Sequence, residues 1–330
     1  MPAPSLARWK RWLPGAVLLT FIAHAAAPKA PPVSSEPPAI RVPVWVEEEQ
    51  PSSPAALRFE ATINGRPARI AATQGPTSDL IVLVVLDLTD DISLIEPAKQ
   101  ALIDNISRLP ANAWVGVLRA QDGLHVLADP NPDRKPAVNA IESLSTSGKP
   151  GLFETLDSAL RIADSMMRAS PVRVAVLYLT DGNIYNYRED YTNPVINSSD
   201  PHDLSRRFPE ALVIEKVSRM QETLASLEGP LFIAHLHYRT DRLNEAYQNG
   251  LKTLADETAG EAEFSRSPAD IPDSINRMFA RMLSGSSLTV NLPSEARENL
   301  QVKITGRAGD AEARLYWRSR YVWKRKAKSL

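Results

Sequence analysis

The segment LIVLVVLDLTDD, residues 80–91, decides the fold of this chain. Its first seven residues are all aliphatic, and such a run predicts a strand buried on both faces, in the centre of a mostly parallel sheet. The run stops at Asp87, and Thr89 and Asp91 follow at alternating positions. Because ligand sites in open α/β sheets lie beyond the carboxyl ends of the strands, we expect these side chains at the functional edge of the sheet.

A second predicted strand ends in the same way. The segment VRVAVLYLTDG, residues 172–182, places Asp181 directly after its β-forming residues. Carboxylate and hydroxyl oxygens that converge from two strand ends suit a hard divalent cation such as Mg²⁺, Mn²⁺ or Ca²⁺. The sequence therefore predicts a metal site made of Asp87, Thr89, Asp91 and Asp181.

Strand-like and helix-like segments alternate from residue 79 to residue 283, which predicts a doubly wound α/β domain with a mostly parallel sheet. In that region the apolar spacing switches between about 2 and 3.6 residues. Further strands are expected at residues 114–120, 124–127, 231–238 and 261–264, and helices near residues 93–109, 152–167, 208–227, 243–254 and 271–282. Ser93 and Glu96 have the spacing of a capping box at the start of the first helix.

The flanking regions read as β-structure. Residues 57–78 contain Asn64-Gly65 between two strand-like pieces, a strong hairpin signal because both turn positions need positive φ. Residues 284–330 carry three more strand-like pieces and a basic tail. We expect the two regions to form one small β-rich annex. A short strand over residues 40–46 contains Pro43 and is predicted to lie at a sheet edge.

The first 56 residues predict export. Residues 1–25 combine a basic start with a short apolar stretch that ends in small residues, as in a cleaved signal peptide, and residues 26–56 form a Pro-rich linker with one short strand. About 15 apolar residues fall short of the roughly 20 that span a bilayer, so no transmembrane span is expected in the mature chain. The absence of cysteine favours a bacterial periplasmic or secreted protein.

Composition excludes several other classes. Removing residues 1–25 deletes three basic residues and no acid, which changes the net charge from −1 to −4 and disfavours nucleic-acid binding. The sequence contains no GxSxG elbow, P-loop, GxGxxG or HExxH motif, so we expect no enzyme. A metal-dependent phosphatase-like enzyme built on Asp87 stays a third alternative, although Thr89 stands where such enzymes need a second aspartate.

Three of these motifs together resemble the von Willebrand factor type A domain: the strand with its Asp-x-Thr-x-Asp end, LTDG at residues 179–182, and LADETAG at residues 254–260. The hairpin FEATINGRPA, residues 59–68, and the strand-rich tail are similar to those of exported type A-related proteins of acidobacteria. The resemblance covers about residues 57–320. It implies a Rossmann-like fold and a protein-binding module.

Type A domains often carry a metal-ion-dependent adhesion site with the motif DxSxS, a threonine and a further aspartate. The resemblance places Asp87 and Asp181 at the two aspartates, Thr89 at the first serine and Asp91 at the second. The segment GKPGLFETL, residues 148–156, is similar to the family's loop but has Pro150 in place of the threonine. The implied function is cation-assisted capture of an acidic side chain of a protein partner.

Several alternatives remain open from the sequence. Asp91 could instead cap the following helix. A metal-free scaffold could bind partners through the Tyr/Asn-rich segment 183–205, with Tyr185, Tyr187 and Tyr191 as contact residues. His235 and His237 could form a zinc pair, but without a third ligand we expect them to be polar residues near a strand end.

Overall fold

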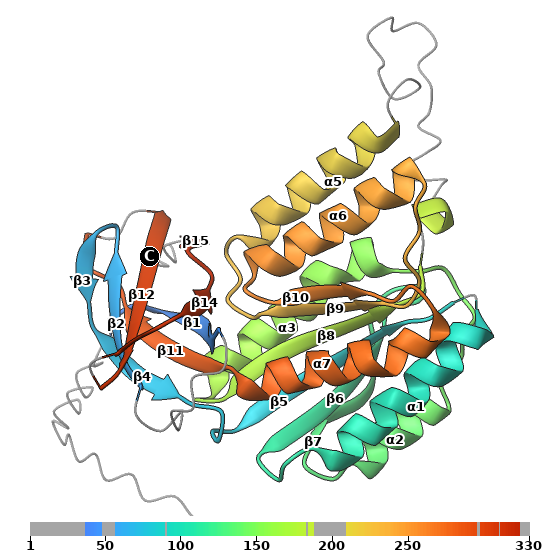
Figure 1. The fold of residues 1–330 in the computed structure, drawn as a ribbon, viewed down its shortest axis with the longest axis horizontal. Coiled ribbons are helices and arrows are strands. Elements are labelled where there is room, and N and C mark those ends of the chain that lie inside the picture. The colour runs from blue at the N-terminus through green and yellow to red at the C-terminus, as the bar shows by residue number, and fades with distance from the viewer. Residues whose placement is uncertain are drawn as a thin grey trace, which may run out of the picture. The chain divides into compact units, whose positions relative to one another are not determined.

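A six-stranded sheet forms the centre of the fold, with the strand order β10-β9-β8-β5-β6-β7 (Figure 1). The computed structural model describes residues 37–47, 57–89, 91–182, 184–187, 209–295, 298–309 and 311–323. The strands are β5 (Leu80–Asp87), β6 (Ala113–Arg119), β7 (His125–Asn131), β8 (Arg173–Thr180), β9 (Leu231–His235) and β10 (Glu261–Phe264). In chain order this is the doubly wound 3-2-1-4-5-6 arrangement. Only the pairing of β6 with β7 is antiparallel within this sheet, so the predicted fold class is confirmed.

Helices cover both faces of the sheet because successive residues of the buried strands point to opposite sides. Val82 and Val84 of β5 pack into one core cluster, and Leu83 and Val85 pack into the other. The first face is covered by α1 (Ile92–Arg108), α2 (Lys135–Glu142) and α7 (Ile271–Ser284), and the second by α3 (Leu152–Ala169), α5 (Pro209–Leu224) and α6 (Arg242–Glu257). Each helix in the described part of the chain is too short or too polar to cross a membrane.

The predicted β-rich annex is present and consists of two small sheets that share one hydrophobic core. The Asn64-Gly65 turn has φ values of 51° and 77°, as the hairpin prediction requires. One sheet has the order β14-β1-β11-β4 and the other β13-β12-β2-β3, with β15 paired to β12. Their bounds are β1 (Ala39–Val46), β2 (Leu57–Ile63), β3 (Arg66–Ala68), β4 (Ile70–Gln74), β11 (Ser286–Asn291), β12 (Asn299–Ala308), β13 (Ala311–Ala313), β14 (Leu315–Trp317) and β15 (Arg320–Val322).

The prediction that the Pro43 strand lies at an edge is wrong for the second half of that strand. β1 pairs with β11 over Ala39–Val44 and with β14 over Val44–Val46, so it lies between these two strands in the sheet. Pro43 lies just before the pairing with β14 begins at Val44, so its missing N–H does not remove a hydrogen bond to β14. The sequence could not show this, because β14 joins the sheet from residues 315–317, far along the chain.

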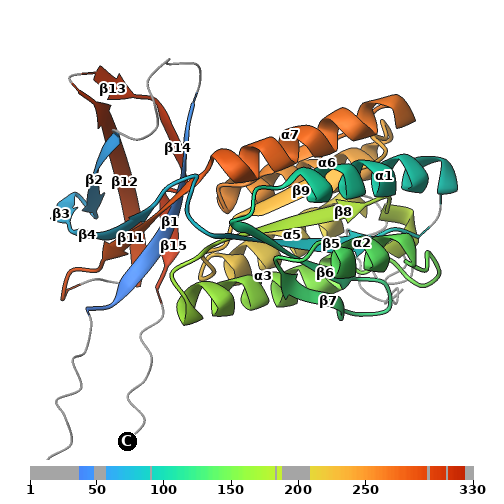
Figure 2. The ribbon, with the colours of Figure 1, turned by 90° about the horizontal axis from the view of Figure 1, so that it is seen from below.

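Three buried or half-buried arginines join the annex to the sheet domain, and each donates hydrogen bonds to carbonyl groups near the C-terminal end of a helix. Arg41 of β1 donates to Ser170 O and Val172 O beyond α3. Arg318 donates to Leu224 O, Ala225 O and Leu227 O at the end of α5. Arg173 does the same at the end of α7, as described below. The annex therefore packs at the amino ends of the parallel strands (Figure 2).

Both covalent connections between the annex and the sheet domain meet at Arg173. Its guanidinium donates to Pro76 O (2.7 Å) and Ser78 O (3.1 Å) in the connection from β4 to β5. It also donates to Gly285 O (2.8 Å) in the connection from α7 to β11, and to Met282 O and Leu283 O at 3.4 Å. Burial lowers the pKa of Arg173 to about 10.

Candidate functional site

Asp87 and Asp181 come together because β5 and β8 are parallel neighbours. Asp87 is the last residue of β5 and is in register with Thr180, the last residue of β8. Asp181 follows immediately, and its backbone N–H donates to Asp87 O at 3.4 Å. The two carboxylates therefore lie at the carboxyl edge of the sheet, at the end opposite to the annex.

The carboxyl group of Asp87 is fully buried and held at both oxygens. Oδ1 accepts from Gly151 N at 2.8 Å, and Oδ2 accepts from Thr180 Oγ1 at 3.2 Å. Burial raises the pKa of Asp87 to about 7, the hydrogen bond from Gly151 opposes this rise, and the charge of Asp181 adds to it. Asp87 thus binds a proton at neutral pH far more readily than an exposed aspartate does.

The loop after β5 folds around Asp181, which is 3% exposed. Asp181 Oδ1 accepts from Thr89 N at 2.9 Å and from Thr89 Oγ1 at 3.4 Å. Asp181 Oδ2 accepts from Asp91 N at 3.3 Å. Three of the four predicted ligand side chains, those of Asp87, Thr89 and Asp181, therefore lie in one cluster.

The side chain of Asp91 is directed elsewhere. It is exposed, and its Oδ1 accepts from Ser93 N (2.9 Å) and Ser93 Oγ (2.6 Å), which makes Asp91 the N-cap of α1. The predicted capping box of Ser93 and Glu96 is wrong by two positions, because the helix begins at Ile92. A ligand role for Asp91 stays a prediction and would require its carboxylate to leave Ser93.

Two substitutions of Asp91 separate these roles. Asp91→Ser keeps a good N-cap, whereas Asp91→Ala removes it and is expected to lower the melting temperature by about 3 °C. Thermal unfolding measured with EDTA and with Mn²⁺ gives both readouts. If Asp91 only caps α1, both variants retain the full cation response of the parent chain. Loss of that response in Asp91→Ser would show that the carboxylate is a ligand.

The loop that carries Pro150 supplies backbone donors to the site. Asp122 holds this loop by accepting from Lys149 N at 3.0 Å, and Gly151 N reaches Asp87. Ser145 and Ser147, which precede Pro150 in this loop, share a hydrogen bond with each other at 2.7 Å. A side chain at Gly151 would place its Cβ 2.0 Å from Ala120 O, so only glycine allows this approach.

Sequence reasoning did not assign roles to Thr180 and Gly151, which hold Asp87 in place. The signal for Thr180 is available in the sequence, because it aligns with Asp87 when the two predicted strands are set in parallel register. No comparable signal exists for Gly151, because its role depends on how closely the 148–151 loop approaches β6.

His235 is a buried core residue and not half of a zinc pair. Its Nε2 bonds to Gly182 O at 2.8 Å, and its Nδ1 accepts from His237 N at 3.3 Å. Burial lowers its pKa to about 4, so the ring is neutral at pH 7. Among the described residues, no group of three or more His, Cys, Asp or Glu is arranged to hold a metal ion.

Only part of the Tyr/Asn-rich segment can be placed. Tyr185, in the short 3₁₀ helix Ile184–Tyr187, is 49% exposed, and its hydroxyl donates to Asp241 Oδ1 at 3.0 Å. Asp241 is the N-cap of α6. Tyr191 and the side chain of Tyr187 lie outside the described residues, so their predicted contact roles stay predictions.

No protein-family model and no curated protein matches the chain. Among solved structures, it is similar to a von Willebrand factor type A protein from Catenulispora acidiphila (13% identity, TM-score 0.45, 88% of this chain and 75% of that one). It is also similar to the vWF domain of the type V pili tip protein Mfa5 from Porphyromonas gingivalis, with 13% identity, a TM-score of 0.42, and coverage of 64% of this chain and 95% of that one. The similarity to BatB from Bacteroides thetaiotaomicron has 15% identity, a TM-score of 0.37, and coverage of 61% of this chain and 98% of that one. The relation to acidobacterial proteins stays a prediction. The order and direction of the six strands are what give residues 80–284 the fold expected of a von Willebrand factor type A-like domain.

Proposed function

We propose that this chain is an exported protein-interaction module that binds a divalent cation between Asp87, Thr89 and Asp181 and uses it to capture an acidic group of a protein partner. One observation carries the proposal: the Asp87 carboxyl is fully buried beside a second carboxylate, and both burial and that neighbour raise its pKa. Two such groups are stable together only when a proton or a cation lies between them.

The donor set fits a hard cation. Asp87 and Asp181 offer carboxylate oxygens, and Thr89 offers a hydroxyl that now donates to Asp181. Backbone N–H groups from Gly151, Thr89 and Asp91 orient both carboxylates before any ligand arrives. When bound, the cation would supply an open coordination position for a partner carboxylate. Because Pro150 has no side-chain oxygen, this site would hold the cation with one protein ligand fewer than the family pattern.

A metal-free scaffold is the second candidate. It is favoured by the exposed Tyr185, which is fixed at the start of α6 by its bond to Asp241. In that case partner binding would survive EDTA and depend on segment 183–205. A phosphatase-like reaction stays third, because a nucleophilic carboxylate must reach its substrate and Asp87 is fully buried.

Thermal unfolding of the mature chain tests the first proposal. A cation at 100 times its dissociation constant should stabilise the fold by about 2.7 kcal/mol, a rise of roughly 5 °C over the EDTA sample. Asp87→Asn keeps an acceptor for Gly151 N–H but removes the charge, and it should abolish this rise. Asp104→Asn, on the exposed face of α1, is the matched control and should keep it. No rise with Mg²⁺, Mn²⁺ or Ca²⁺ in the parent chain would reject the cation and favour the scaffold.

Export is proposed from residues 1–25, which lie outside the described residues. A periplasmic or secreted location would place the site where bacterial envelope or extracellular proteins could reach it. Fractionation of cells that produce the full chain, with N-terminal sequencing of the product, tests this. Cleavage near residue 25 is the expected result, and an intact N-terminus in the cytosolic fraction would contradict it.

A further inference from the structure

The loop of residues 236–239 follows β9 and lies directly beside the candidate site. His235, at the end of β9, is in register with Thr180, whose hydroxyl holds Asp87. Leu236 N donates to Thr180 O at 2.9 Å, and His235 Nε2 bonds to Gly182 O. The acidic cluster and this loop are therefore joined through the end of β8.

Hydrogen bonds hold the backbone of this loop at each of its residues beyond Leu236. His237 N donates to His235 Nδ1, and Tyr238 N donates to Ser265 O at 2.7 Å. Arg239 exchanges two bonds with the buried amide of Gln248, at 2.9 Å and 2.8 Å. A loop fixed in this way holds its side chains in defined positions at little further cost in entropy.

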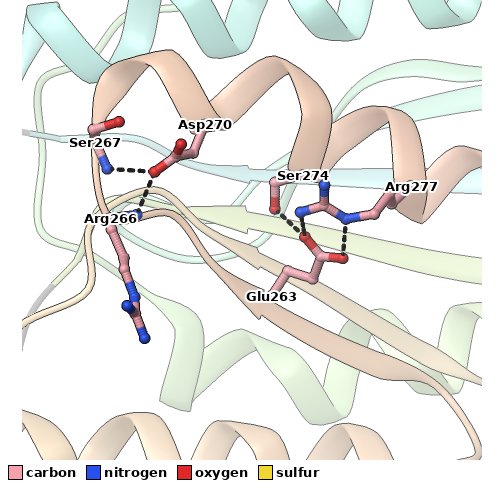
Figure 3. Close-up of polar contacts among 6 residues, drawn as sticks. All are labelled: Glu263, Arg266, Ser267, Asp270, Ser274 and Arg277. Carbon is pink, nitrogen blue, oxygen red and sulfur yellow. Dashed lines mark hydrogen bonds and ion pairs between the residues drawn. The ribbon is translucent and has the colours of Figure 1, made fainter.

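The neighbouring loop after β10 is also fixed, which keeps Ser265 in place. Arg266 N and Ser267 N both donate to Asp270 Oδ2, at 3.2 Å and 2.9 Å (Figure 3). In α7, one to two turns after Asp270, Ser274 and Arg277 donate hydrogen bonds to the carboxylate of Glu263 in β10. The Arg266 guanidinium lies over the Tyr238 ring, 5.8 Å from its centroid.

Two side chains on the fixed loop carry buried nitrogens without a hydrogen-bond partner in the described part of the chain. These are Nδ1 of His237 and Nε of Arg239. No ion pair of Arg239 is found among the described residues either. A buried polar atom left unpaired is costly, so each such group calls for an explanation.

The loop that carries both side chains lies beside the acidic cluster, because Leu236 N donates to Thr180 O and His235 Nε2 bonds to Gly182 O. The pKa of Asp91 is lowered first by its bonds to Ser93 and then by the charges of His237 and Arg239. Neither forms an ion pair with Asp91, which remains bonded to Ser93.

We propose that His237 and Arg239 form a second, anion-binding subsite beside the cation position, and that the partner is an acidic peptide segment with two carboxylates. One carboxylate would complete the cation at Asp87 and Asp181, and the other would pair with the Arg239 guanidinium, whose planar fork matches a carboxylate. The inference rests on the proposed function for the first carboxylate only. The cation position follows β5 and β8, and Arg239 follows β9, which is the neighbour of β8 in the sheet. We therefore expect one acidic peptide segment to reach both positions.

Fluorescence anisotropy with synthetic peptides tests the subsite on the mature chain loaded with Mn²⁺. The probes are labelled glycine-rich peptides with two aspartates separated by zero to three residues, and the reference peptides replace one aspartate by asparagine. The best two-aspartate peptide should bind about tenfold more tightly than its reference. Arg239→Gln should reduce that ratio to about one without changing the thermal shift produced by Mn²⁺. Arg242→Gln, on the exposed side of α6, should leave both unchanged.

Equal binding of the paired peptides at every spacing, or a ratio that survives Arg239→Gln, would overturn the subsite. Tighter binding of a phosphoserine peptide than of any two-aspartate peptide would also overturn it, in favour of a phosphate ligand. Absence of the thermal shift with Mn²⁺ would count against the cation and not against the subsite. In that case the affinity of the one-aspartate reference peptide in EDTA, compared between the parent chain and Arg239→Gln, decides the subsite alone, and equal affinities would overturn it.

Discussion

Replacing Arg173 by leucine is expected to lower the free energy of unfolding by about 4 kcal/mol, the largest loss we expect from a single polar residue. The guanidinium is 5% exposed and satisfies carbonyl groups of both connections to the annex and of the end of α7. Leucine fills part of the volume but leaves these acceptors unpaired in a buried position. Each buried acceptor left without a donor costs about 1–3 kcal/mol.

Urea unfolding followed by circular dichroism measures this loss. Arg173→Lys keeps a charge but has three donors, so it should recover about half of the lost stability. Arg161→Leu is the matched control, because Arg161 lies on the exposed face of α3 and pairs with Asp157 in the preceding turn. A loss below about 1 kcal/mol for Arg173→Leu, equal to that of the control, would show that water replaces the guanidinium at these carbonyls.

Glu228→Gln is expected to make the fold more stable at pH 8 and to remove a pH dependence from it. Burial raises the pKa of Glu228 to about 7, a hydrogen bond from Arg41 N opposes the rise, and the charge of Asp164 adds to it. A carboxyl whose folded pKa exceeds its ordinary value of 4.5 stabilises the fold fully below pH 4.5. That contribution is lost as the pH rises through about 7, and it amounts to about 3 kcal/mol.

The test compares the parent chain and Glu228→Gln by urea unfolding from pH 5 to pH 8. The difference in free energy of unfolding between the two should grow in favour of the variant across this range. Glutamine keeps an acceptor for Arg41 N–H, so the fold should be retained. Comparing the two chains also cancels the titration of Asp87, whose pKa is raised as well. A constant difference would show that Glu228 is ionised and solvated throughout.

The architecture could be predicted because it depends on local patterns. The run at residues 80–86 is apolar on both faces and must be central, and parallel strands bring Asp87 and Asp181 to one edge whatever the loops do. The Asn64-Gly65 hairpin and the amphipathic helices follow from the local sequence in the same way.

The remainder depends on rotamers and on contacts across long sequence separations. An aspartate at position 91 is compatible both with binding a cation and with capping α1. Only the short hydrogen bond from Ser93 Oγ to its carboxylate distinguishes the two roles. The carbonyl partners of Arg173 come from residues 76–78 and 282–285, so the sequence around position 173 does not predict them. The unpaired nitrogens of His237 and Arg239 are visible only once the loop backbone is placed.

The position of Arg173 has a mechanical consequence. Both peptide links to the annex leave the sheet domain at the amino ends of the strands, beside this one side chain, while a partner would be held at the far ends of β5 and β8. Tension between the partner and the annex would therefore run along β5, from Asp87 back to Leu80. Because β5 is bonded to β6 on one side and β8 on the other over this length, the load falls on both ladders in shear, with many bonds strained at once. Such an attachment resists pulling better than one in which bonds open singly.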